Sequence, residues 1–195
     1  RGWRLRIFGA HSAWAMAAEE KCGSQTGVAR FRARGELNSC IARRLDDLPA
    51  SWRLNAGVNN ATRGAGWWRW KPYYLLRELQ AVPHGDVLVH TDYDLQLSKH
   101  PSGLWCLGQN EPRGVVTFHF PCLTDRAWTK AEVATALGAS PAMLDTSTLY
   151  AGLLVLRRTP AAEAFLQEWL GLTLRGELAT DALAPGVVQD PTFVE

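Results

Sequence analysis

Two carboxylates, Asp92 and Asp94, come directly after the apolar run of residues 87–90. Such a run is typical of a buried strand, and a strand that ends in Asp-X-Asp presents carboxylate oxygens at the edge of a sheet. These are the hard ligands that Mg²⁺ or Mn²⁺ prefers, and such a cation keeps coordination positions for substrate phosphates. A turn after Thr91 would let one carboxylate bind directly and the other through water. The sequence therefore predicts a divalent-cation site at Asp92 and Asp94, with two solvated carboxylates as the alternative.

A second candidate is the segment of residues 63–72, Arg-Gly-Ala-Gly-Trp-Trp-Arg-Trp-Lys-Pro. Its glycines permit backbone conformations that other residues resist, and Pro72 suits the first turn of a helix. The free N–H groups and the positive dipole end of a helix N-terminus favour phosphate, and Lys71 would add its charge there. We expect a pyrophosphate near Lys71, and we expect Trp67 and Trp70 to be largely structural.

Further candidate side chains follow the first predicted strand and lie in the later half of the chain. His11 and Ser12 would lie at a strand's carboxyl end, where open α/β sheets bind ligands, so they are candidates for contact with a base or ribose; a solvated loop is the alternative. Asp125 and Asp145 are candidate general bases, with helix-surface or capping roles as the alternative. His90 is expected to be a packed core histidine.

Composition limits the kind of protein. The 195 residues are 47% apolar and 21% charged, which suits a soluble globular domain. The net charge of +2 does not point to nucleic acid, and no apolar run approaches the roughly 20 residues of a membrane span. The four cysteines form no CxxC pair, so buried free thiols are expected, with a disulfide left open. No signal peptide is evident, which predicts a cytoplasmic protein, or a Golgi-luminal one if a targeting segment was removed.

The apolar patterns alternate between strand and helix, which predicts an α/β fold. Strands are expected at residues 5–8, 28–34, 87–90, 115–120 and 149–156. Helices are expected at residues 13–22, 37–45, 72–79, 125–137 and 161–172. Loops are expected at residues 51–62 and 98–103, and the tail, residues 174–195, has few periodic signals. No repeat or linker divides the chain, so residues 1–195 are predicted to form a single domain.

Several of these segments together resemble a known family. Residues 63–76, Arg-Gly-Ala-Gly-Trp-Trp-Arg-Trp-Lys-Pro-Tyr-Tyr-Leu-Leu, and residues 85–94, Gly-Asp-Val-Leu-Val-His-Thr-Asp-Tyr-Asp, resemble glycosyltransferases with the GT-A fold that are related to capsular-polysaccharide and viral sugar transferases. The family pattern runs Arg-Gly-X-Gly-Tyr-Trp-X-Trp-Lys-Pro and then Gly-Asp-X-Leu-X-Tyr-X-Asp. Residues 128–130, 151–152 and 168–170 also match. The resemblance covers most of the chain from Arg63 onward and is weak before it.

The resemblance implies a Rossmann-like GT-A fold, with a mixed, mostly parallel central sheet flanked by helices. It implies a metal-dependent glycosyltransferase that moves a sugar from a nucleotide-diphosphate donor, usually a uridine one, to a saccharide or other hydroxyl acceptor. Mn²⁺ or Mg²⁺ would be held by Asp92 and Asp94. The residues that it places at the donor are Ala10, His11, Ser12, Arg63, Gly64, Gly66, Trp70, Lys71, Asp92 and Tyr93.

The chain departs from the family pattern in places. Many relatives have one Asp followed by Ala-Gly-Cys where residues 92–94 are Asp-Tyr-Asp, and a Gln is common where residues 147–150 are Ser-Thr-Leu-Tyr. Relatives continue past Glu195 into a His-Arg-His-Asp-Gln segment; if it closes the donor site, this chain is expected to bind donor without efficient turnover. A non-catalytic nucleotide-sugar- or carbohydrate-binding module is therefore the alternative. A nucleotidyltransferase is less favoured, because residues 9–12, Gly-Ala-His-Ser, supply no Gly-rich loop with Arg and Lys.

Overall fold

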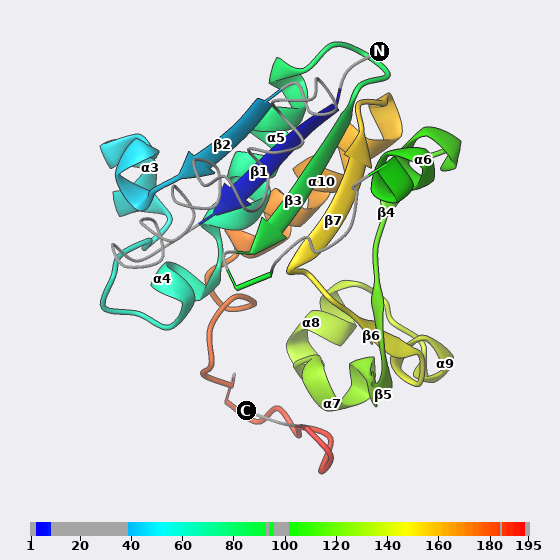
Figure 1. The fold of residues 1–195 in the computed structure, drawn as a ribbon. Helices are drawn as coiled ribbons and strands as arrows, with labels where there is room; N and C mark the ends of the chain where they lie inside the picture. The colour runs from blue at the N-terminus through cyan, green and yellow to red at the C-terminus, as the bar shows by residue number, and fades with distance from the viewer. Residues whose placement is uncertain (1–2, 9–38, 93, 96–101, 184, 194–195) are drawn as a thin grey trace.

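The computed structural model describes residues 3–8, 39–92, 94–95, 102–183 and 185–193. Within them, a central five-stranded sheet has the order β2-β1-β3-β7-β4, and β5 and β6 form a separate two-stranded sheet (Figure 1). The strands are β1 Trp3–Phe8, β2 Ser39–Arg43, β3 Val87–Asp92, β4 Val115–Val116, β5 His119–Thr124, β6 Ser147–Leu149 and β7 Leu153–Arg157.

Helices connect these strands. They are the 3-10 turn η1 Leu45–Asp47 and the helices α3 Ala50–Asn55, α4 Gly64–Trp67, α5 Trp70–Ala81, α6 Ser102–Asn110, α7 Asp125–Trp128, α8 Ala131–Ala136, α9 Pro141–Leu144 and α10 Pro160–Thr173. None of the helices in the described part of the chain combines the length and the apolar character that crossing a bilayer requires.

The central sheet is parallel on one side and antiparallel on the other. β1 lies parallel to β2 and to β3, whereas β7 lies antiparallel to β3 and to β4. The prediction of an α/β architecture is confirmed, but the expected mostly parallel sheet is not shown, because the pairings of the described sheet are two parallel and two antiparallel. The register pairs Phe8 with Asp92, so the carboxyl ends of β1 and β3 lie level at one edge of the sheet.

The main core lies between the central sheet and a layer formed by α5 and α10 (Figure 1). Apolar residues at helical spacing place Leu75 and Leu79 of α5 and Leu166 of α10 on the sheet, where they are fully buried against Leu88 and Leu156. Burial of each such side chain stabilises the fold by about 2 kcal/mol. This core therefore fixes the position of β3, which carries Asp92.

Helix α6 packs on a second apolar cluster, formed by Cys40, Val87, Val89 and Val155. The contact is close at Gly108, where a Cβ atom would lie 2.9 Å from Cγ1 of Val155. The strand that ends at Asp92 is thus packed by helices on both faces.

A lobe formed by β5, β6 and α7–α9 lies beyond the edge at which β3 ends, and the tail that follows α10 also runs there (Figure 1). The chain enters this lobe after β4 and returns to the central sheet at β7. The space outside the carboxyl ends of β1 and β3 is therefore bordered by the lobe, by the tail and by α4.

The prediction of a helix over residues 37–45 is wrong. The structure has β2 there, followed by η1. All five residues of β2 pair with β1, and this tertiary pairing outweighs the local preference for helix. The loop predicted for residues 51–62 likewise contains the short helix α3.

Three other predicted elements are split. Residues 115–120 are divided between β4 and β5, and residues 149–156 between β6 and β7, because the chain passes between the central sheet and the lobe at both places. The helix predicted for residues 125–137 is divided into α7 and α8, since Lys130 takes extended backbone angles (φ −60°, ψ 143°).

The remaining predicted elements divide into confirmed and undescribed ones. The strands at residues 5–8 and 87–90 are confirmed as β1 and β3, and the helices at residues 72–79 and 161–172 as α5 and α10. The described part of the tail contains no helix or strand, as expected. The helix predicted at residues 13–22, the strand at 28–34 and residues 98–101 of the predicted loop lie outside the described residues. The loop prediction is wrong for Ser102 and Gly103, which begin α6.

The cysteines differ from the expectation of buried free thiols. Cys40 in β2 is disulfide-bonded, and Cys106 and Cys122 are free but exposed. The sequence could not show this, because pairing depends on which residues the fold brings together.

Candidate functional site

Lys71 and Asp92 form an ion pair at the carboxyl end of β3, called the Lys71–Asp92 pair below. Lys71 Nζ lies 2.9 Å from Asp92 Oδ1, and it donates hydrogen bonds to Asp92 Oδ2 at 3.0 Å and to the carbonyl oxygen of Ala151 at 3.1 Å. An ammonium group has three protons, so these contacts occupy all of them. Lys71 is 4% exposed and comes from the first turn of α5. It therefore positions the Asp92 carboxylate.

His90 supports the same carboxylate from within β3. Its Nε2 lies 3.2 Å from Asp92 Oδ1, and the residue is fully buried, as predicted for a core histidine. Burial lowers the pKa of His90 to about 4, so the imidazole is neutral near pH 7. Burial by itself would raise the pKa of Asp92, but the hydrogen bond with His90 and the charge of Lys71 outweigh it and hold that pKa below its usual value. Asp92 is therefore a fixed, ionised carboxylate.

A turn at the end of β3 carries Asp94 to the surface beside this pair. The N–H of Leu95 donates to the carbonyl oxygen of Asp92 at 3.2 Å, which closes a turn over residues 92–95. Asp94 is exposed, and its side chain has no hydrogen bond or ion pair with the residues that the structure describes. Within the described part of the chain, the oxygen lone pairs of Asp94 are therefore available to a ligand.

Residues 150–152 close the site on the side of β7. The N–H of Asp92 donates to the carbonyl oxygen of Gly152 at 2.8 Å, so the backbone of Asp92 is fixed as well as its side chain. A Cβ atom on Gly152 would lie 2.3 Å from Cζ of Tyr150, so glycine is required for the Tyr150 ring to lie there. Burial, and then the charges of Asp94 and Asp92, raise the pKa of Tyr150. Its hydroxyl is therefore within electrostatic reach of both carboxylates.

The segment labelled α4, together with Trp68, is a left-handed turn that precedes α5. Residues 64–68 all have positive φ, and three of them carry side chains: Ala65 (φ 52°), Trp67 (φ 51°) and Trp68 (φ 56°). An L-residue in this conformation costs about 1–2 kcal/mol. Backbone strain of this size clusters at functional sites, where surrounding contacts hold it in place.

The two glycines of the turn allow contacts that hold it. A Cβ atom on Gly64 would lie 2.4 Å from the ring of Trp68, and one on Gly66 would lie 2.8 Å from Cα of Val58. Trp70 is 4% exposed and donates from Nε1 to the carbonyl oxygen of Gly64 at 2.9 Å. Trp70 is thus a structural residue of the turn, as expected.

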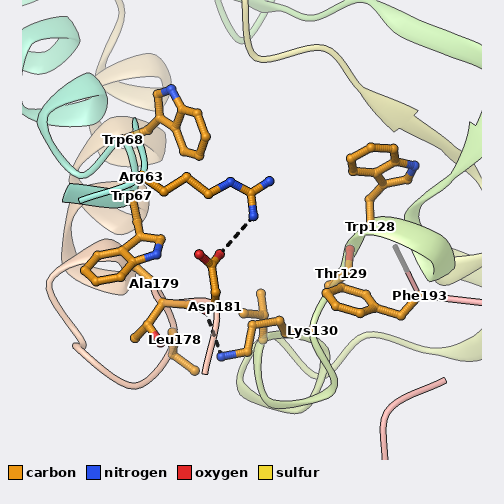
Figure 2. Close-up of a pocket in the computed structure, with 12 residues that line it drawn as sticks. Arg63, Trp67, Trp68, Trp128, Thr129, Lys130, Leu178, Ala179, Asp181 and Phe193 are labelled. Carbon is orange, nitrogen blue, oxygen red and sulfur yellow. Dashed lines mark hydrogen bonds and ion pairs between the residues drawn. The ribbon is translucent and has the colours of Figure 1, made fainter. Parts of the chain in front are cut away.

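A pocket of about 310 Å³ opens beside this turn, and it is called the aromatic pocket below. Figure 2 shows Trp67 and Trp68 on one side, Trp128 and Phe193 on the opposite side, and the ion pair of Arg63 and Asp181 between them. The ion pair has a separation of 3.1 Å. The residues that line the pocket are Arg63, Trp67, Trp68, Trp128, Thr129, Lys130, Val133, Leu178, Ala179, Thr180, Asp181 and Phe193.

Two buried cations hold the tail segment that forms the floor of the aromatic pocket. Lys130 donates to the carbonyl oxygens of Glu177, Thr180 and Ala182, and Arg69 donates to those of Ala56, Gly176 and Ala179. Both residues are 8% exposed. Because the described part of the tail has no helix or strand, these contacts satisfy carbonyl groups there and fix the floor.

The two candidate general bases lie in the lobe. Asp145 is ion-paired with Arg126 at 2.7 Å, and this hydrogen bond lowers the pKa of Asp145. Asp125 begins α7, and its Oδ2 accepts a hydrogen bond from Thr146 at 3.4 Å. No contact among the described residues joins either of them to the Lys71–Asp92 pair.

The residues predicted at the donor separate into three groups. Lys71 and Asp92 come together in one ion pair. Arg63 lines the aromatic pocket, whereas Gly64 and Gly66 belong to the left-handed turn and Trp70 is hydrogen-bonded to it. The predictions for Ala10, His11, Ser12 and Tyr93 lie outside the described residues.

The floor of the aromatic pocket and the wall that carries Trp128 and Phe193 were not predicted from the sequence. Asp181, which pairs with Arg63 from 118 positions away, lies in a tail without periodic signals. Trp128 and Lys130 were indicated by the match of residues 128–130 to the family pattern, but without a role. Tyr150 was visible only as the neighbour of the Ala151-Gly152 match.

The carboxylates fit a divalent cation that takes most of its ligands from elsewhere. The described residues bring no three His, Cys, Asp or Glu side chains together at a metal-sized spacing. Mg²⁺, however, is usually held by one or two carboxylates plus substrate phosphates. Lys71 contacts both oxygens of Asp92 and His90 lies 3.2 Å from Oδ1, so little of that carboxylate is left for a cation. The donor set therefore fits a cation bound mainly through Asp94.

Comparison with protein-family models, curated proteins and solved structures finds no match to this chain. The geometry of the site and the resemblance of residues 63–94 are therefore the basis for a functional proposal.

Proposed function

We propose that the chain is a metal-dependent glycosyltransferase with a GT-A fold. It would move a sugar from a nucleotide-diphosphate donor, preferably a uridine-diphosphate sugar, to a saccharide or other hydroxyl acceptor. The Lys71–Asp92 pair beside Asp94 is the observation that carries this proposal. It lies at the edge where β1 and β3 end, and α/β sheets bind ligands outside such strand ends. The family resemblance of residues 63–94 supports the same assignment.

In this proposal Asp94 is the main metal ligand, and Lys71 and His90 orient the carboxylate of Asp92. Mn²⁺ or Mg²⁺, held mainly by Asp94 and in part by Asp92, would offset the charge that develops on the leaving nucleoside diphosphate. Lys71 keeps the Asp92 carboxylate ionised and oriented, and neutral His90 fixes its Oδ1. Because these contacts lie within the protein, the carboxylate needs no reorganisation when substrate binds.

The base that would take the proton of an acceptor hydroxyl stays a prediction. The ion pair with Arg126 and the lowered pKa of Asp145 make that carboxylate a poor proton acceptor. Asp125 has only a long hydrogen bond from Thr146 and is the better candidate of the two.

The disulfide of Cys40 is informative about the cellular compartment in which the protein folds. Disulfides persist in oxidising compartments and are rare in the cytosol. This favours the luminal alternative of the two predicted locations over the cytoplasmic one.

Asp94→Asn tests the proposal with little risk to the fold, because the Asp94 side chain has no partner among the described residues. The measurement is calorimetric titration with a panel of uridine-diphosphate sugars in the presence of Mn²⁺. We expect binding to weaken at least about tenfold, since a charge-assisted ligand is lost. The matched control is Asp46→Asn, which removes a carboxylate that is 85% exposed on η1. Unchanged affinity in Asp94→Asn would overturn the metal assignment.

A non-catalytic nucleotide-sugar- or carbohydrate-binding module is the second candidate. It is favoured by the engagement of Asp145 with Arg126, which leaves Asp125 as the better placed of the two predicted general bases. A donor-hydrolysis assay with and without Mn²⁺ separates the two. Binding of donor without metal-dependent release of free sugar in that assay would favour the module.

A further inference from the structure

The aromatic pocket has the size of a small-ligand site and lies outside the Lys71–Asp92 pair. Its volume of about 310 Å³ is at the lower end of the range for ligand pockets, about 300–1,000 Å³. One sugar residue or the end of a short oligosaccharide suits such a volume better than a long chain does. None of its lining residues belongs to the carboxylate site.

The charges around the pocket are paired, which selects against an ionic ligand. Arg63 is paired with Asp181, and Lys130 donates to three backbone carbonyl groups and lies 3.8 Å from Glu132. These are the charged side chains that line the pocket in the described part of the chain. The Asp181 carboxylate would repel a phosphate placed beside Arg63, and Lys130 is already engaged by carbonyl groups, so the pocket suits a neutral molecule.

Aromatic side chains form opposite walls, and two of them are left open to solvent. Trp68 is 43% and Trp128 47% exposed, and Figure 2 shows them on opposite sides of the pocket. Large exposed aromatic surfaces commonly mark binding sites, because a tryptophan offers a broad apolar face at little entropic cost. The C–H face of a pyranose ring matches such a surface.

The polar groups of the pocket suit hydroxyl groups. The ion pair of Arg63 and Asp181 offers N–H donors and carboxylate acceptors side by side, and hydroxyl groups can use both. The Nε1 atom of Trp67 is buried and has no hydrogen-bond partner in the described residues. Figure 2 shows this nitrogen on the side of the ring that faces Asp181. A buried N–H without a partner is costly, and a ligand oxygen would satisfy it.

The pocket is built before any ligand arrives. The left-handed turn fixes Trp67 and Trp68, and Arg69 and Lys130 fix the tail that carries Asp181. Such preorganisation lowers the entropic cost of binding. We infer that the aromatic pocket binds a neutral saccharide and, if the proposed function holds, that this saccharide is the acceptor.

The test is binding of the full chain to an array of neutral glycans, followed by calorimetric titration of the best ligand without nucleotide or metal. We expect binding in the parent chain and a loss of at least about tenfold in Trp128→Ala, because truncation of an aromatic anchor typically has an effect of this size. Trp128→Phe keeps an aromatic face and should retain most of the affinity. Leu54→Ala, at a residue 82% exposed on α3, is the control for an exposed apolar truncation away from the pocket.

The outcomes separate this inference from the proposed function. Absence of binding to every neutral glycan, or binding that survives Trp128→Ala, overturns the saccharide pocket. The saccharide pocket is also overturned if Trp128→Ala loses binding of uridine-diphosphate sugars and keeps glycan binding, since the pocket would then hold the nucleobase of the donor. Glycan binding that Trp128→Ala abolishes, in a chain that binds no nucleotide sugar, supports the pocket while the transferase proposal fails. Asp94→Asn should leave glycan binding unchanged.

Discussion

The Lys71–Asp92 pair and one wall of the aromatic pocket come from neighbouring segments, because the left-handed turn is followed directly by α5. The two regions nevertheless differ in how far their polar groups are already bonded within the protein. In the pair, buried groups satisfy one another, and Lys71 uses all three of its protons within the protein. In the pocket, the aromatic rings are partly exposed and a buried indole N–H has no partner in the described residues.

The difference shows which region has interactions left for a ligand. A group whose hydrogen bonds are complete can hold a neighbour in place, but it gains little from a ligand. Asp94 and the pocket side chains keep unused hydrogen-bonding and apolar surface, so binding is expected there. Mutations of the pair should therefore change stability, and mutations of the pocket should change binding.

The largest expected effect on stability is that of Lys71→Met. It leaves the Asp92 carboxylate, which is 26% exposed, without its cation, so the free energy of unfolding should fall by about 3–5 kcal/mol. Urea unfolding followed by circular dichroism measures this. Asp46→Asn, which breaks the exposed pair with Arg53, should cost less than about 1 kcal/mol. Equal losses in the two variants would show that the buried pair has no special role.

The next effect is a dependence of stability on pH that comes from the pair and not from the pocket. Between about pH 6.5 and pH 4 the unfolded chain binds a proton at His90 that the folded chain excludes. The free energy of unfolding should therefore fall as the pH is lowered through this window, by on the order of 3 kcal/mol in total. The lowered pKa of Asp92 adds stability that is lost only at still lower pH.

Urea unfolding at a series of pH values with a chelator present measures this dependence, and His90→Gln should flatten it. Among the residues that the structure describes, no histidine lines the aromatic pocket, so Trp128→Ala should keep the slope of the parent chain. A slope that is the same in His90→Gln and the parent would contradict the assignment to His90.

Gly66→Ala tests the turn that links the two regions. Gly66 has φ 99°, and a Cβ atom would meet Cα of Val58 at 2.8 Å, so we expect a loss of about 2 kcal/mol. Gly171→Ala is the matched control: it lies within α10 with open space around it, and the change should stabilise the helix by about 0.5–1 kcal/mol. A thermal melt of each variant distinguishes these opposite signs.

The smallest effect on stability is expected for Asp181→Asn. The carboxylate is 58% exposed in its pair with Arg63, so the change should cost less than about 1 kcal/mol. The same variant should weaken glycan binding, because a hydroxyl acceptor of full charge is lost. A large loss of stability without a change in glycan affinity would contradict the view that the pocket side chains serve binding and the pair serves stability.

The parts of the fold that could be predicted are those with strong local patterns. The apolar run at residues 87–90 and the helical spacing of Leu75, Leu79 and Leu166 led directly to β3, α5 and α10. The error at residues 37–45 has a different origin. β2 exists because β1 lies beside it, and a neighbour in space leaves no periodic signal in the segment itself.

The candidate site shows the same division. Lys71 and Asp92 could be singled out separately, because each follows a recognisable local context, but their direct contact could not. Lys71 was expected to face a phosphate, and only the fold shows that it faces Asp92 and Ala151. The pairing of Arg63 with Asp181 joins a patterned segment to an unpatterned tail, so sequence reasoning had no means of finding it.

The backbone of the left-handed turn at residues 64–68 has the conformation that D-amino acids prefer and L-amino acids avoid. A D-residue favours the backbone conformation that costs an L-residue energy. D-alanine at position 64, introduced by chemical ligation, would carry its methyl group in place of the other α-hydrogen, away from the point where an L-methyl group meets the Trp68 ring at 2.4 Å. The segment that carries Arg63 and the tryptophans to the pocket is thus a short piece of mirror-image helix, and its glycines are the nearest that ribosomal synthesis comes to supplying D-amino acids.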